Sequence, residues 1–130
     1  MGHLQWTPNL SVGNPTLDGH HQRLIGMINA GLDATETTSQ QDVGRILSDL
    51  LNYTRYHFTE EEMVMEDAGY PGLEAHRKIH ADLSWKVGEM YERYKSDPAA
   101  FPAADLFTFL SKWLIEHIGG EDQRYHPYLY

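Results

Sequence analysis

The stretch that decides the fold is VGRILSDLLNYTRYHFTEEEMV, residues 43–64. Its inward-facing positions recur at alternating steps of four and three residues, which is the spacing of a helix packed in a bundle. His57 and Glu61 stand at two of these positions, one helical turn apart, where aliphatic side chains are expected. The stretch therefore predicts a bundle helix that carries polar groups inward. Its inward positions are Val43, Leu47, Leu50, Thr54, His57, Glu61 and Val64.

Three other stretches have the same helical spacing, so we expect four helices and no strands. The breaks between them are short: residues 69–72 (GYPG) form a turn, and Gly119 with Gly120 is expected to end the fourth helix. Ser39 and Asp42 resemble a capping box before the second. Short connections predict an all-α, up-down-up-down four-helix bundle. The helices are expected at about residues 18–36, 40–67, 73–95 and 102–118.

The whole chain, residues 1–130, is interpreted as one domain. Residues 1–16 have no helical spacing and are expected to form an extended N-terminal arm that packs on the body through Trp6 and Leu10. Residues 17–118 would form the bundle and residues 119–130 a tyrosine-rich tail. Because Met1 comes just before the arm, we expect a free-standing protein rather than a module of a receptor.

Composition argues against several classes of protein. With 19 acidic and 10 basic residues the formal charge is −9, so a nucleic-acid partner is not expected. The absence of cysteine excludes disulfides, thiolate catalysis and iron–sulfur clusters. No secretory signal is visible, and no run approaches the ~18 apolar residues of a membrane span. We therefore expect no membrane insertion and a cytoplasmic location.

The unusual feature is the number of histidines, eight in 130 residues. Each expected helix places at least one at an inward position, together with Glu61. A single inward histidine is more often a hydrogen-bonded core residue than a ligand. Five buried imidazoles and a carboxylate would be costly without a partner, and a metal ion binds both kinds of group directly. The five inward histidines are His21, His57, His76, His80 and His117.

The donor set narrows the metal chemistry. The Glu-x-x-His motif of ferritin-like sites and the His-Glu-x-x-His motif of zinc proteases are both absent. Five histidines are too many for one ion and suit two adjacent ions, and nitrogen ligands favour iron, copper or zinc over calcium or magnesium. Asp122 follows His117 by five residues. By spacing alone it is more often a surface residue, although a loosened helix end would bring it back toward the metal.

These motifs together resemble the hemerythrin family over nearly the whole chain. They occur in order on the expected helices, and the set of four is far more specific than any one of them. The motifs are Trp6 with Val12-Gly13 and residues 17–21 (LDGHH), residues 57–63 (HFTEEEM), Tyr70-Pro71 with His76 and His80, and residues 113–118 (WLIEHI) with Asp122.

The resemblance implies a function: reversible dioxygen binding, for storage, delivery or sensing, by a protein that is not an enzyme and is expected to be a monomer. An oxygen-consuming enzyme or a membrane system would be the recipient. The implied cofactor is a pair of iron ions, Fe2+ or Fe3+, with an oxo or hydroxo bridge. In this scheme His76, His80 and His117 hold one iron, His21 and His57 hold the other and leave it an open position, and Glu61 and Asp122 bridge the two.

An oxygen site also needs a dry apolar pocket. His20 stands where the family usually has glutamine or glutamate, and we expect it either to touch a ligand residue or to be exposed. His3 and His126 are expected at the surface. The pocket is expected to be lined by Leu24, Phe58, Trp113, Leu114 and Ile118, which also serve ordinary core packing.

Two other functions remain open. A two-iron site that admits oxygen could belong to an enzyme that reduces peroxide or nitric oxide, although no acid–base residue is obvious beside the open position. A bundle with structural zinc, or with no metal, is the other reading. Without a metal, such a bundle would bury many ionisable groups.

Overall fold

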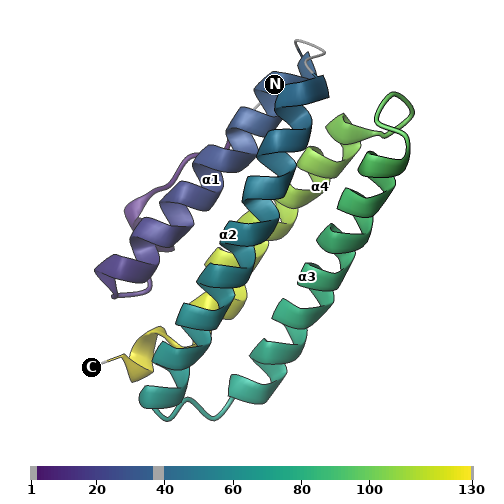
Figure 1. Cartoon of the computed structure of the whole chain (residues 1–130). Coiled ribbons are helices and arrows are strands. Elements are labelled where there is room, and N and C mark those ends of the chain that lie inside the picture. Colours follow the sequence, from purple (N-terminus) through teal and green to yellow (C-terminus); the bar gives the residue numbers. More distant parts are fainter. Residues whose placement is uncertain (1–2, 37–39, 130) are drawn as a thin grey trace.

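The computed structural model describes residues 3–36 and 40–129, without the side chains of residues 40 and 41. Four long helices run alternately up and down (Figure 1), and the described residues contain no strand. The expected all-α four-helix bundle is therefore confirmed. Ser39, part of the expected capping box, lies outside the described residues. The helices are α1 (Pro15–Glu36), α2 (Gln40–Asp67), α3 (Leu73–Ser96) and α4 (Ala103–Glu116).

The first helix begins inside the expected arm. It starts at Pro15, because proline has a backbone angle suited to a first helical turn. The side-chain oxygen of Asn14 accepts a hydrogen bond of 3.0 Å from the backbone N–H of Leu17, which caps the new helix end. The arm is therefore shorter than expected and includes a single 3-10 turn, Pro8–Leu10.

The inward face of α2 shifts by one residue near its end. The expected inward positions are buried up to Glu61, but Val64 is half-buried and its neighbour Met65 is fully buried. A straight helix drifts by ~20° per heptad relative to a strict seven-residue repeat. Over a helix of 28 residues this drift explains why the buried position moves from Val64 to Met65. Met65 packs in a small apolar cluster with Val12, Leu17 and Tyr125, beside the main core.

The arm and the tail both pack on the bundle. Trp6 and Leu10 lie against the main core, as expected. Gly13 has a φ of +79°, and a Cβ atom there would meet the ring of His126 at 2.6 Å. His3 is exposed as expected, whereas His126 is half-buried in this contact between arm and tail. No helix in the described part of the chain is long and apolar enough to cross a membrane.

Candidate metal centre

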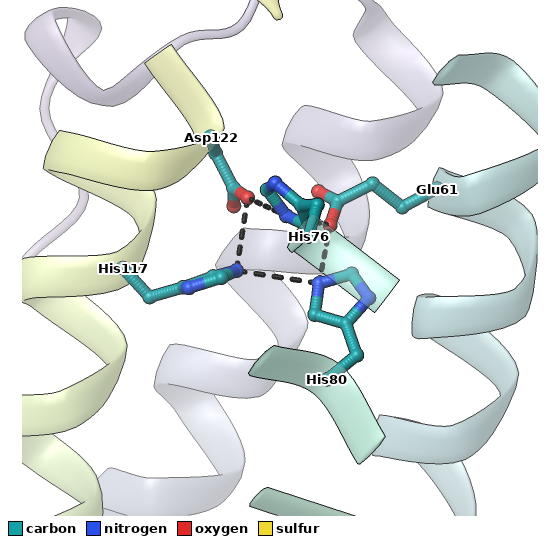
Figure 2. Close-up of side chains that lie close together, drawn as sticks. All are labelled: Glu61, His76, His80, His117 and Asp122. Carbon is teal, nitrogen blue, oxygen red and sulfur yellow. Dashed lines mark hydrogen bonds and ion pairs between the residues drawn. The ribbon is translucent and has the colours of Figure 1, made fainter. Parts of the chain in front are cut away.

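Seven ionisable side chains meet inside one end of the bundle. All four helical segments contribute, and every one of these side chains is buried. Figure 2 shows five of them, converging from α2, α3 and the end of α4. The structure thus brings together the whole set predicted from sequence: His21 from α1, His57 and Glu61 from α2, His76 and His80 from α3, and His117 and Asp122 from the end of α4.

The two oxygens of Glu61 face different histidines. Oε1 lies 3.0 Å from Nε2 of His80 and 3.5 Å from Nε2 of His76. Oε2 lies 3.2 Å from Nε2 of His21 and 3.5 Å from Nε2 of His57. One carboxylate therefore serves two groups of imidazoles.

Asp122 divides its oxygens in the same way. Oδ1 lies 3.0 Å from Nε2 of His76 and 3.0 Å from Nε2 of His117 (Figure 2). Oδ2 lies 3.2 Å from Nε2 of His21. Each carboxylate thus presents one oxygen to the group His76, His80 and His117, and the other oxygen to the group that contains His21.

A π-helical turn places Asp122. Gly119 and Gly120 were expected to end the last helix, but the chain instead continues as the wider turn η2, His117–Glu121. The backbone N–H of Asp122 donates to the carbonyl of His117, five residues earlier. This wider turn returns residue 122 to the face that carries His117. The loosened helix end that was expected before Asp122 is this π-helical turn.

Several polar atoms of the cluster have no hydrogen-bond partner within the described residues. They are His21 Nδ1, Glu61 Oε1, His76 Nε2 and both carboxylate oxygens of Asp122. All but the first lie 3.0–3.5 Å from a facing nitrogen or oxygen of the cluster, so they are held by close ion-pair contacts rather than by well-aligned hydrogen bonds. The donor atoms fall into two sets, and within each set all atoms lie within 4.8 Å of one another. Glu61 belongs to both sets. The site therefore fits cations that bind imidazole nitrogen and carboxylate oxygen.

The electrostatics of the metal-free cluster follow from these contacts. Burial alone would lower the pKa of His21 and of His76, but the close carboxylates of Asp122 and Glu61 raise both to about 9. Burial would raise the pKa of Glu61, yet four histidines hold it well below its usual value. Burial lowers the pKa of His57, which favours its neutral form. In metal-free protein the positive charge of protonated His21 and His76 thus replaces part of the charge that a bound cation would supply.

Tyr125 supports the cluster and was missed in the sequence. Its hydroxyl donates a hydrogen bond of 2.7 Å to Glu61 Oε2, and its side chain is fully buried. The sequence gives one weak signal, because Tyr125 follows Asp122 by three residues. This spacing places the two residues on one face only if the chain stays helical beyond Gly120, whereas Gly119 and Gly120 favour a helix end.

His20 also contacts the cluster. It is 8% exposed, and its Nδ1 lies 3.0 Å from Nδ1 of His57. Of the two outcomes expected for His20, contact with a ligand candidate is confirmed and exposure is wrong. The reason is that α1 packs closely on α2 at this level, where Tyr53 and Tyr56 also cover the ring of His20.

Four of the five residues expected around the oxygen pocket line one apolar cavity. The volume of this cavity, counted as the space open to the centre of a water molecule, is about 20 Å³. Leu24, Phe58, Trp113 and Leu114 belong to its wall, while Ile118 lies elsewhere in the core. The ring of Phe58 stacks on His80 at 3.7 Å between centroids, and Trp113 stacks on His117 at 4.5 Å. Aromatic rings thus cover the cluster on the side that faces the core.

Fold and cluster together define a class: a four-helix bundle with a buried site fit for cations. The hemerythrin HHE cation binding domain family matches residues 12–129. The chain therefore belongs to the hemerythrin family. Its fold matches a crystal structure of wild-type hemerythrin with a TM-score of 0.91 at 26% identity, covering 98% of each chain.

Individual relatives carry related names. The chain is 36% identical over 126 residues to a bacteriohemerythrin of Stenotrophomonas maltophilia, covering 96% of this chain and 80% of that protein. It is 29% identical to a bacteriohemerythrin of Methylococcus capsulatus, over 86% of this chain and 85% of the relative. A myohemerythrin of Riftia pachyptila is 30% identical, over 92% of this chain and 88% of its own.

Proposed function

We propose that this protein binds dioxygen reversibly at a non-haem centre of two iron ions. The observation that carries the proposal is the division of each carboxylate between two groups of histidines. A single ion can bind both oxygens of a carboxylate, but it cannot at the same time reach two groups of histidines that face opposite oxygens, so the two donor sets favour two ions. The family and the names of the relatives support the choice of iron and dioxygen.

In this proposal the ligands divide into two sets, bridged by the carboxylates. His76, His80 and His117 would hold one iron, His21 and His57 would hold the other, and Glu61 and Asp122 would be available to both. When bound, the two iron ions supply the electrons that reversible dioxygen binding requires. The ligand set itself contributes five neutral imidazoles and two negative charges, which offset much of the charge of the buried cations.

The apolar cavity is the proposed oxygen pocket. Its size suits a diatomic molecule, and its mostly apolar wall offers only two proton donors, the hydroxyl of Thr54 and the indole N–H of Trp113. Excluding water and protons favours release of dioxygen over irreversible oxidation of the site. We place Ile118 in the packing behind the pocket rather than in its wall.

An iron assay combined with visible absorption tests the proposal. Spectra are taken without oxygen, in air, and after oxygen is removed again. We expect two irons per chain and a band that appears in air and fades reversibly. Iron that oxidises in air without a reversible band would shift the function to reduction of peroxide or nitric oxide. Zinc, or no metal, would contradict the proposal.

A pair of neighbouring substitutions supplies the matched control. Asp122→Ala should lose at least half of the bound iron and the reversible band, because it removes one of the two carboxylates. Glu121→Ala changes a carboxylate outside the cluster and should retain both. Metal analysis and absorption of the purified variants measure the difference, and equal iron content in the two would contradict the role of Asp122.

Storage, delivery and sensing of oxygen all remain within this proposal. We propose that the protein acts as a monomer in the cytoplasm and passes oxygen to an oxygen-consuming enzyme or a membrane system. Sedimentation of the iron-loaded protein tests the first part. A dimer at micromolar concentration would contradict it.

A further inference from the structure

The two ring nitrogens of His57 have different surroundings. Nε2 points into the cluster, 3.5 Å from Glu61 Oε2, and Nδ1 lies 3.0 Å from Nδ1 of His20. Both imidazoles are buried, so bulk water does not satisfy these two nitrogens. Two ring nitrogens at this distance form a hydrogen bond only when one carries a proton and the other does not.

The direction of this hydrogen bond follows from the role of His57. A histidine that binds a metal through Nε2 keeps its lone pair there and carries its proton on Nδ1. Resting on the two-metal function above, we propose that His20 is a positioning residue for His57. By accepting the Nδ1–H of His57 it fixes both the tautomer and the ring orientation of that ligand, and its own proton lies on Nε2.

His20 is itself held in place from two helices. It lies on α1 directly before His21, so one turn of α1 supplies both a ligand and the partner of a ligand. Its ring packs against Tyr53 and Tyr56 of α2, with centroids 5.8 Å and 5.4 Å away. These contacts keep the acceptor nitrogen of His20 opposite His57.

The other group of histidines has a different outer partner. Nδ1 of His80 lies 2.8 Å from Oε2 of Glu62, a carboxylate that Arg77 approaches to 3.5 Å at its other oxygen. A charged acceptor raises the basicity of a ligating imidazole more than a neutral imidazole does. The metal position of His21 and His57 is therefore the weaker of the two, and it depends on His20.

Nuclear magnetic resonance of histidine-labelled, metal-free protein tests the tautomer, because a metal bound at Nε2 would by itself hold the proton of His57 on Nδ1. We expect the proton of His57 on Nδ1 in the wild type and in His20→Gln, whose amide oxygen also accepts. His20→Phe keeps a ring of similar size but no acceptor, and should give a mixture of tautomers. A proton on Nε2 of His57 in the wild type, or unchanged Nδ1–H in His20→Phe, would overturn the proposal. The wild-type spectrum decides even where a variant fails to fold.

Zinc titration by calorimetry tests the inequality of the two positions. The weaker binding step should lose about 10- to 100-fold in affinity in His20→Phe and recover in His20→Gln, while the tighter step stays unchanged. His3→Phe, in the exposed part of the arm, is the matched control. Equal loss in both steps, or no loss, would overturn the proposal. A single zinc step in the wild type would instead contradict the two-metal function, and the tautomer in metal-free protein would still test His20.

Discussion

At the scale of single residues, Glu61 shows how much of the centre depends on one side chain. Its carboxylate contacts histidines from α1, α2 and α3 and accepts a hydrogen bond from Tyr125. Burial of such a charge is tolerated only with several partners. Tyr125 provides the partner that does not depend on a metal. It therefore contributes to the stability of both the loaded and the empty protein.

We expect Tyr125→Phe to lower the free energy of unfolding by about 1.5–3 kcal/mol, because it removes a buried hydrogen bond to a charged group. Urea denaturation of metal-free protein measures the loss. Tyr128→Phe, whose ring is 45% exposed, should stay within about 0.5 kcal/mol of wild type. Equal stability of the two variants would show that the bond between Tyr125 and Glu61 contributes nothing.

At the scale of elements, α3 depends on the centre more than its neighbours do. Its buried side chains are His76, His80, Leu83 and Val87, so half of them belong to the cluster. The buried positions of α1 include six aliphatic side chains, which hold that helix without the centre. The first half of α3 is thus attached to the bundle mainly through its two histidines and through ion pairs of Arg77 with Glu62 and Glu66.

Removal of the metal should therefore loosen the first half of α3 selectively. We expect amide hydrogen exchange over residues 73–82 to speed up at least about tenfold in metal-free protein, as local opening becomes easier. Residues 24–32 of α1 provide the internal comparison and should change far less. Uniform acceleration along all four helices would contradict this and would indicate that the whole bundle depends on the metal.

At the scale of the whole molecule, the cluster links stability to pH. In metal-free protein the pKa values of His21 and His76 are raised to about 9, from 6.5 in an unfolded chain. The folded state thus binds these protons more tightly than the unfolded state does. Their stabilising effect is complete below pH 6.5 and is lost as the pH rises toward 9.

The melting temperature of metal-free protein should accordingly fall by about 5 °C or more between pH 6.5 and pH 9. Metal-loaded protein should not show this fall, because bound cations replace the protons and hold the imidazoles neutral. Calorimetric scans of both forms at matched ionic strength measure the difference. A melting temperature of the metal-free form that rises over this range would contradict the protonation of His21 and His76.

Local periodicity explains what could be predicted from the sequence. The inward positions of α2 up to Glu61 follow from helix geometry alone, since a side chain's direction depends on its place in the turn. The same rule places His21, His76, His80 and His117 on inward faces. Their chemistry then predicts a shared site, because buried imidazoles require partners. By itself the sequence therefore determined the bundle, its helices and five inward histidines.

Contacts between distant segments were decided only by the tertiary structure. His20 meets His57 across 37 residues, and Tyr125 meets Glu61 across 64, so neither contact leaves a periodic signal. The π turn at His117 is also a tertiary outcome, because Gly119 and Gly120 by themselves favour a helix end. Beyond this turn Tyr125 packs against Val12, Leu17 and Met65, a contact between distant segments that no local pattern predicts. Helix periodicity sets which way a side chain points, whereas the packing of helices against one another sets what it meets.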